Sequence, residues 1–229
     1  MSAYISNVLI ANADFENKLN NLKIRLKSRM NGQTTEQMQN GQIDYALNYG
    51  VSLQHVQELA AELDYTPAEC TLLWQLNIRE AMLIAAIKMP TQCATPAEMM
   101  RWIPFIKTPD MVEQSVFFLF WRVTDIDIFL TLLLQSDAQF ALSVAFFAAG
   151  KALQKQRSIA TQTLNMLTNA IANKTQWSQP EARGASLLLR QIGQTKAFAA
   201  EVKRIISTMK QSTNQLQEQI AFEVDMAIF

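Results

Sequence analysis

The residues with the clearest chemical potential in this sequence are cations gathered in its last third. Residues 151–210 contain ten Lys and Arg side chains and two carboxylates, a net charge of +8. Cations on neighbouring elements can neutralise successive phosphates of a nucleic acid and release its counterions. An indole beside them can stack on a base or a sugar. The candidate nucleic-acid-binding residues are Lys174, Trp177, Arg183, Arg190, Lys196, Lys203 and Arg204. The alternative interpretation is a solvated surface with a few ion pairs.

This cationic segment stands out because the rest of the chain, taken together, has a net charge of −8. The chain carries 20 Lys+Arg and 20 Asp+Glu residues, so its net charge is zero. Residues 41–150 hold 12 acidic and 5 basic side chains, a net charge of −7. A neutral total argues against a protein that simply coats nucleic acid, whereas asymmetry between segments points to a local site for an anionic partner.

No constellation for acid–base, nucleophilic or metal chemistry is evident. The one histidine, His55, falls in the first turn of a predicted helix, where the dipole disfavours a charged imidazole. Cys70 and Cys93 have no metal-ligand spacing. Asp125 and Asp127, two residues apart on a helix, point to different faces. The sequence therefore predicts no catalytic residue, no metal site and no cofactor.

The elements that must position the cations are predicted to be helices. Phe15, Leu19, Leu22, Leu26 and Met30 recur at helical spacing and form one apolar stripe. No segment shows the alternating pattern of a strand between hairpin turns. The predicted helices span residues 2–12, 15–30, 34–40, 52–64, 67–76, 78–89, 96–103, 109–122, 125–135, 138–154, 158–173, 179–193, 196–210 and 213–227.

Several helix starts have clear capping signals. The segments 66–69 and 95–98 both read Thr-Pro-Ala-Glu, which places Thr at the N-cap, Pro at the first helical position and Glu at the third. Thr108-Pro109-Asp110 and Ser178-Gln179-Pro180-Glu181 are further starts of the same type. These capping signals indicate where each helix begins.

Short loops between many amphipathic helices are typical of a bundle or a solenoid. Helix pairs that recur every 30–40 residues favour the solenoid. We expect an all-α, HEAT-like α-α superhelix built of antiparallel helix pairs. No Pro/Gly/Ser-rich linker divides the chain, so we expect a single domain over residues 1–229, with residues 1–50 as a candidate N-terminal extension packed on it.

The sequence indicates a cytoplasmic protein. Its N-terminus lacks a basic region followed by an apolar run. The most apolar stretch, 126–150, is interrupted by Gln135, Ser136 and Asp137, and neither part approaches the roughly 20 apolar residues that a bilayer crossing needs. Two cysteines without an evident bridge are typical of a reducing compartment. We therefore expect no membrane partner.

Three segments carry a family resemblance. Residues 73–80, Leu-Trp-Gln-Leu-Asn-Ile-Arg-Glu, are similar to the LWxLxxRE signature of the AlkD-like DNA alkylation repair family. Residues 49–59 resemble that family's glycine-containing turn into a helix, and residues 188–193 resemble its penultimate helix with a Leu-Arg step. The resemblance covers most of residues 20–227. Without it, Arg79 and Glu80 indicate an ordinary exposed pair.

The resemblance implies a fold and an activity. It implies a C-shaped stack of HEAT-like helix pairs whose basic concave groove holds duplex DNA. Active members of the family excise alkylated purines with a Trp-Trp-x-x-x-Asp helix start, an Arg one or two helices later and a Trp before the Leu-Arg step. Aromatic faces there hold the cationic lesion, and the carboxylate stabilises the positive charge that develops on the sugar.

This sequence differs from that pattern at every position. Pro109 and Asp110 stand at the paired Trp, Gln114 at the Asp, Ser143 at the Arg and Leu187 at the last Trp. Excision by the family's mechanism should therefore be severely impaired, although Asp110 or Glu113 can supply a carboxylate.

The leading hypothesis is a DNA-binding HEAT-like repeat protein without the glycosylase activity, which binds DNA weakly or by its structure. The first alternative is an alkylpurine DNA glycosylase with a rearranged active site. The second is a protein-interaction scaffold with a protein partner, the common use of helical solenoids.

Overall fold

The computed structural model describes residues 2–32 and 45–228, with side chains from residue 13 onward. Within these residues the regular elements are twelve α-helices and three short 3-10 helices, with a single isolated bridge between Leu47 and Ile78 and no strand. The all-α prediction is confirmed. The predicted helix 34–40 lies outside the described residues.

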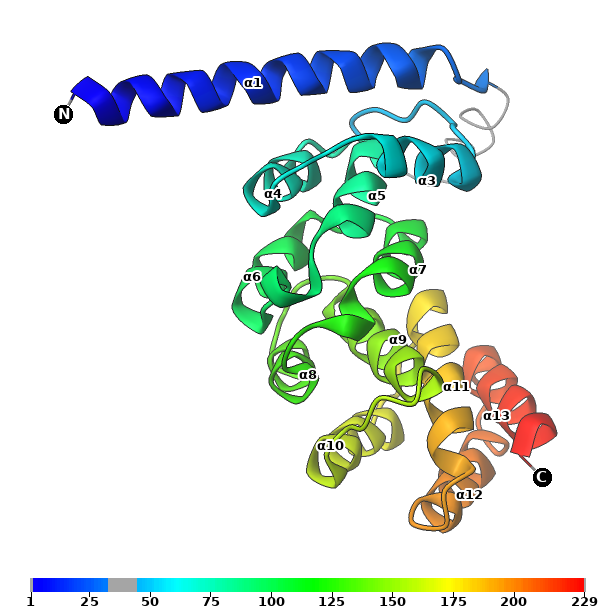
Figure 1. Cartoon of the computed structure of the whole chain (residues 1–229). Helices are drawn as coiled ribbons and strands as arrows, with labels where there is room; N and C mark the ends of the chain where they lie inside the picture. Colours follow the sequence, from blue (N-terminus) through cyan, green and yellow to red (C-terminus); the bar gives the residue numbers. More distant parts are fainter. Residues whose placement is uncertain (1, 33–44, 229) are drawn as a thin grey trace. The chain divides into compact units, whose positions relative to one another are not determined.

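From α3 to α13 the helices follow one another through short connections (Figure 1). They are α1 (Ser2–Lys27), α3 (Leu53–Glu62), α4 (Pro67–Gln75), α5 (Arg79–Lys88), α6 (Pro96–Trp102), α7 (Pro109–Phe118), α8 (Ile126–Leu134), α9 (Ala141–Gln154), α10 (Thr161–Ala172), α11 (Gln179–Gly193), α12 (Ala199–Met209) and α13 (Gln215–Ile228). The 3-10 helices are η1 (Thr91–Cys93), η2 (Ile103–Phe105) and η3 (Phe120–Arg122).

The predicted N-caps position three of these helices. The hydroxyls of Thr66, Thr95 and Thr108 accept hydrogen bonds from the backbone N–H groups three residues later, at 3.2–3.3 Å. Proline follows each threonine and fixes φ at the first helical position. Since each helix start is specified locally, the sequence located α4, α6 and α7 to within a few residues.

The first helix differs from the prediction. We expected two helices, 2–12 and 15–30, but α1 runs without a break from Ser2 to Lys27. Neither Ala13 nor Asp14 breaks a helix, and Asp14 pairs with Lys18 one turn later at 3.1 Å. Met30 lies beyond the helix end and is 59% exposed, so it does not extend the buried stripe.

The helices divide into two compact units, residues 1–88 and 89–229. In the first unit α5 packs against both α3 and α4. In the second unit the helices are arranged in two rows, and successive helices of a row contact each other. The prediction that residues 1–229 form one domain stays a prediction.

In the first unit, α1 contributes apolar side chains and ion pairs. Leu22 and Leu26 are buried completely or nearly so. The Lys18 ammonium donates to Glu69 at 2.8 Å, and Arg25 pairs with Glu62. Glu69 is also the capping-box residue of α4, so one carboxylate serves both the start of α4 and α1.

The signature segment 73–80 forms a buried polar clasp in the first unit. Glu80 is fully buried and accepts hydrogen bonds from the backbone N–H groups of Tyr49 and Val51, both at 3.2 Å. Arg79 is 5% exposed and donates to the Val51 carbonyl at 3.3 Å. The expectation of an ordinary exposed pair was wrong, because the chain at Leu47–Val51 folds over both side chains and takes up their hydrogen bonds.

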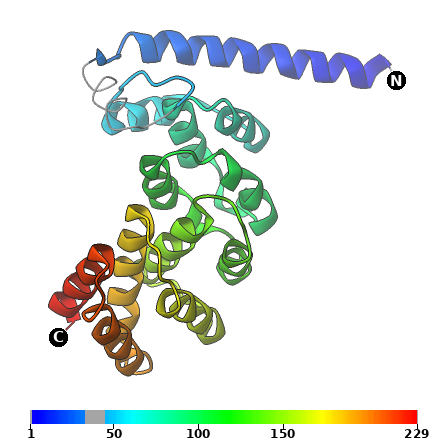
Figure 2. The ribbon, with the colours of Figure 1, turned by 180° about the vertical axis from the view of Figure 1, so that it is seen from behind.

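The second unit is built as two rows of helices. Helices α6, α8 and α10 contact one another in succession, and α7, α9, α11 and α13 form a second succession, here called the α7 row (Figures 1 and 2). From α6 to α11 the chain passes from one row to the other through short loops, and α12 links α11 to α13 and packs against both. This is the helix-pair repeat of a HEAT-like fold, as the sequence predicted.

Two glycines bring α9 and α11 close together. A Cβ on Gly150 would lie 2.7 Å from Leu187 Cγ and 3.0 Å from the backbone nitrogen of Leu188. A Cβ on Gly184 would lie 3.0 Å from Phe146 Cβ. Glycine is required at both positions because the opposite helix occupies the space of a side chain. The α7 row is therefore most tightly packed at its centre.

Candidate nucleic-acid interface

Most of helix α11 is buried. Nine of its fifteen residues are buried, because α7, α9, α12 and α13 all contact it. The side chains that are not buried include Arg183, Leu187 and Arg190, at spacings of four and three residues, and Gln194 follows at the helix end. We call these four residues the α11 stripe. Two of the predicted phosphate-binding residues, Arg183 and Arg190, therefore lie on one face of one helix.

The α11 stripe continues onto α7 and α9. Arg183 donates from Nη1 to Glu113 Oε1 on α7 at 2.8 Å, and both side chains remain more than a third exposed. One turn after Glu113, the ring of Phe117 is 52% exposed. The ammonium of Lys151, from α9, lies over this ring, 5.0 Å from its centroid.

On the other side, the α11 stripe approaches α13. Ser186 Oγ donates to Glu223 Oε2 at 2.5 Å, and Gln219 donates to the second oxygen of the same carboxylate at 2.8 Å. Burial tends to raise the pKa of Glu223, but these two hydrogen bonds and the charges of Arg190 and Arg183 outweigh it, so the pKa is lowered. Glu223 is thus held as a carboxylate beside the arginines.

Lys174 and Trp177 lie in the loop that leads into α11. The Lys174 ammonium pairs with Glu181 at 3.0 Å and lies 5.8 Å from the indole centroid. The indole donates to the Lys174 carbonyl at 3.2 Å and packs against Phe146 of α9, with ring centroids 6.3 Å apart. These contacts with protein hold the half-buried Trp177 and the loop against α9.

The remaining predicted residues lie beyond the C-terminal end of α11. Lys196 is exposed in the loop to α12. Lys203 and Arg204 are exposed on α12, where Arg204 makes two hydrogen bonds to Glu201 at 2.7 and 3.0 Å. The structure thus places the seven predicted residues on α11, at its two ends and on α12, and joins Arg183 and Arg190 on one face.

A model of the family described as DNA alkylation repair enzyme matches residues 22–218 of the chain. The chain belongs to the DNA alkylation repair enzyme family. Its fold is similar to a solved structure described as "A new family of proteins related to the HEAT-like repeat DNA glycosylases with affinity for branched DNA structures". The TM-score is 0.68 at 12% identity, and the match covers 91% of this chain and 94% of that chain. No curated protein matches the sequence.

This DNA alkylation repair family member departs from the glycosylase pattern at several positions. These positions lie on helices of the α7 row. Gln114 is half-buried on α7, and Ser143 is 1% exposed within α9. Leu187 packs directly over Gly150, where α9 and α11 approach each other closely. Of the two carboxylates that the sequence offered instead, Glu113 is paired with Arg183, and Asp110 lies half-buried in the first turn of α7.

Phe117 and Lys151 were not singled out from the sequence. The sequence does indicate that one of two aromatic rings is exposed. Phe117 and Phe118 are adjacent, and a helix cannot turn both toward one buried face. The partner of the exposed ring, Lys151, is 34 residues away in sequence and was not identifiable from helical spacing within α7.

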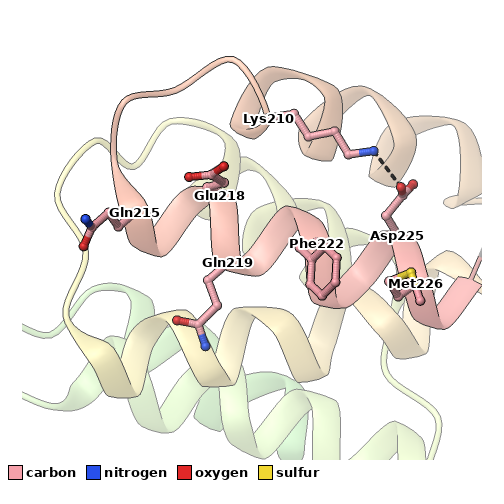
Figure 3. Close-up of a pocket in the computed structure, with 7 residues that line it drawn as sticks. All are labelled: Lys210, Gln215, Glu218, Gln219, Phe222, Asp225 and Met226. Carbon is pink, nitrogen blue, oxygen red and sulfur yellow. Dashed lines mark hydrogen bonds and ion pairs between the residues drawn. The ribbon is translucent and has the colours of Figure 1, made fainter.

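A separate hollow lies on the outer face of α13 (Figure 3). It is lined by Lys210, Gln215, Glu218, Gln219, Phe222, Asp225 and Met226. Its cation, Lys210, is bound to Asp225 at 2.6 Å, and Glu218 adds a further carboxylate. This lining carries more negative than positive charge and does not suit a phosphate.

The described part of the chain shows neither a metal-binding cluster nor a membrane-spanning helix. Among residues 2–32 and 45–228 no group of three His, Cys, Asp or Glu side chains is placed to hold a metal ion. Within the same ranges no helix has the length and hydropathy of a membrane span.

Proposed function

We propose that this chain binds DNA, with a preference for branched structures, through the α11 stripe and the cations at the two ends of α11. The observation that carries the proposal is the position of Arg183 and Arg190. They lie on the solvent-facing stripe of an otherwise buried helix, in a member of the DNA alkylation repair enzyme family. The structural relative with affinity for branched DNA supports the choice of ligand.

Each candidate residue has a distinct role in this proposal. Arg183 and Arg190 bind phosphate oxygens, for which the planar guanidinium is suited. Lys174, Lys196, Lys203 and Arg204 extend the positive potential beyond both ends of the stripe and contribute through counterion release. Trp177 positions the loop that carries Lys174, and as a half-buried indole it can also contact a sugar or base.

We also propose that the chain does not excise alkylated bases by the family's mechanism. That mechanism needs a free carboxylate beside aromatic walls to stabilise a developing positive charge. Here Glu113 already has a guanidinium as its partner at 2.8 Å, which offsets the negative charge. Release of methylated bases from alkylated DNA, lost in Glu113→Gln or Asp110→Asn, would instead establish the rearranged glycosylase.

The test is binding of the full chain to a three-way junction and to a duplex of equal length, by fluorescence anisotropy between 50 and 200 mM salt. Arg183→Gln/Arg190→Gln should weaken binding to both DNAs and reduce the slope of log K against log salt by about 2. Arg101→Gln is the matched control, because Arg101 is an exposed cation on α6, in the other row, where it pairs with Glu98 at 3.3 Å. It should leave binding unchanged.

The outcome that overturns the proposal is absence of binding to either DNA at 50 mM salt. In that case a stable complex with a protein partner would select the scaffold hypothesis. We further propose a cytoplasmic location, which is supported by the two cysteines, Cys70 and Cys93, since neither is part of a disulfide in the described part of the chain.

A further inference from the structure

The exposed ring of Phe117 is an unusual feature of the α7 row. A phenylalanine on a helix of a packed repeat normally faces the core. Here Val116, its neighbour in sequence, is 2% exposed, whereas Phe117 is 52% exposed. The ring therefore stands on the solvent side of α7, on the same face as Glu113 one turn earlier.

Neighbouring groups hold this ring in one orientation. Phe118 meets it edge to face, with ring centroids 4.9 Å apart and an angle of 87° between the ring planes. At the end of α7, Trp121 Nε1 donates to the carbonyl of Phe117 at 3.1 Å, which fixes the backbone that carries the ring. An aromatic face that is exposed and already oriented loses little conformational entropy when a ligand stacks on it.

One cation contacts the ring, and a second is bound to a residue one helical turn away. The Lys151 ammonium lies over it, and Arg183 is held by Glu113, which is one helical turn from Phe117. Burial and the charge of Lys155 lower the pKa of Lys151. An ammonium that has lost part of its hydration, next to a second cation, gains an anionic ligand readily.

We propose that Phe117 is the stacking platform for an unpaired base of branched DNA, with Lys151 and Arg183 binding the phosphates on either side of that nucleotide. This inference rests on the proposed DNA-binding function. On binding, the Lys151 ammonium moves from the ring to a phosphate and leaves the aromatic face to the base. Arg183 exchanges the Glu113 carboxylate for a second phosphate.

An unpaired base is the ligand that this arrangement fits. In a continuous duplex both faces of each base are covered by their neighbours, so a side chain has no face to stack on. At a branch point an unpaired base presents a free face, and stacking on an aromatic side chain is tolerant of sequence. A protein partner is disfavoured because the ring is accompanied by cations that suit phosphates, with Lys151 over the ring and Arg183 on Glu113.

The test compares three variants on two DNAs. The probe is a three-way junction with one unpaired thymine at the branch, and the reference is a fully paired duplex. Phe117→Leu keeps the site apolar and removes the aromatic face, so it should weaken junction binding by about tenfold and leave duplex binding unchanged. Phe117→Trp should restore junction binding. Phe222→Leu is the matched control, because Phe222 is a 65% exposed phenylalanine of the same unit on α13 (Figure 3), and it should have no effect.

A second measurement locates the base directly. Replacing the unpaired thymine by 5-iodouracil and irradiating the complex should cross-link the base to the peptide that contains Phe117. A cross-link elsewhere, or equal junction affinity for Phe117→Leu and the wild type, overturns the platform while leaving the proposed function intact. Failure of the wild type to bind either DNA overturns both.

Discussion

The two units each contain an arginine–glutamate pair, and the pairs are opposite in character. In the first unit Arg79 and Glu80 are 3.7 Å apart, with side chains 6% and 0% exposed. In the second unit Arg183 and Glu113 are 2.8 Å apart, with side chains 55% and 37% exposed. The shorter contact is the more exposed one.

The difference lies in what else each carboxylate binds. Glu80 accepts two backbone N–H groups, and Arg79 donates to a backbone carbonyl, so removing either leaves buried polar groups without partners. Glu113 and Arg183 are both in contact with water, which competes for each of them and screens their attraction. A buried pair therefore holds the chain together, whereas an exposed pair can be exchanged for a ligand.

The largest effect should come from breaking the buried pair. Glu80→Ala removes the carboxylate next to the buried Arg79 guanidinium and leaves the backbone N–H groups of Tyr49 and Val51 without that acceptor. We expect a loss of about 3–5 kcal/mol in the free energy of unfolding of the first unit. Urea unfolding followed by circular dichroism measures it. Glu58→Ala, at an exposed carboxylate on α3, should change stability by less than about 0.5 kcal/mol. A similar small loss for Glu80→Ala would show that the clasp is not structural.

The next effect should come from separating α9 and α11. In Gly184→Ala the new methyl meets Phe146 Cβ at 3.0 Å and the Phe147 backbone nitrogen at 3.1 Å, so the helices must move apart. Overpacking costs about 1–3 kcal/mol, and the better helix propensity of alanine offsets up to about 1 kcal/mol of it. We expect a lower Tm together with weaker DNA binding, because the α11 stripe shifts. Gly32→Ala, where nothing lies within 4 Å of the new Cβ, is the matched control.

A smaller effect is expected from Lys18→Met, which removes a half-buried ion pair of the first unit. Burial tends to raise the pKa of Glu69, but hydrogen bonds from Lys18 and Thr66 outweigh it and lower the pKa. A hydrogen bond to Glu69 raises the pKa of Lys18 above 10.5. The stabilisation from Glu69 is therefore lost as pH falls below its usual titration range, and that from Lys18 is lost as pH rises above 10.5.

Between these limits the variant should be less stable than the wild type by less than about 1 kcal/mol. The two unfolding curves should converge at both extremes of pH. A constant difference across the whole range would mean that Lys18 acts through packing of its aliphatic chain.

The smallest effect on stability should come from breaking the exposed pair. Glu113→Gln should change the free energy of unfolding by less than about 0.5 kcal/mol. It should also release Arg183 and remove a negative charge from the interface, so DNA affinity should rise by up to about fivefold. Anisotropy titrations beside thermal unfolding separate the two effects. Unchanged affinity would place the phosphate contacts away from Arg183.

The sequence predicted most of the fold because helix starts are local. Thr66, Thr95 and Thr108, each followed by proline, specify where three helices begin without reference to the rest of the chain. The start of α11 and its end at Gly193 were predicted at the residues that the structure shows. The predicted division into helices 2–12 and 15–30 was wrong, because no proline or glycine interrupts this segment and α1 continues through Ala13 and Asp14.

The candidate site was less predictable because its contacts are long-range. Arg183 and Glu113 are 70 residues apart, and no periodicity relates them. The burial of Glu80 depends on a segment about 30 residues earlier that folds over it. Arginines 183 and 190 were predictable as a pair, since a spacing of seven residues places them on one face of any helix.

The double use of Glu69 has a consequence for how the first unit responds to change. Its carboxylate both closes the first turn of α4 and anchors α1 through Lys18. Detaching α1 would leave that carboxylate with only its local partners, and its affinity for protons would rise. The docking of α1 therefore changes the acidity of a side chain 51 residues downstream of Lys18, and an NMR titration of Glu69 can measure it.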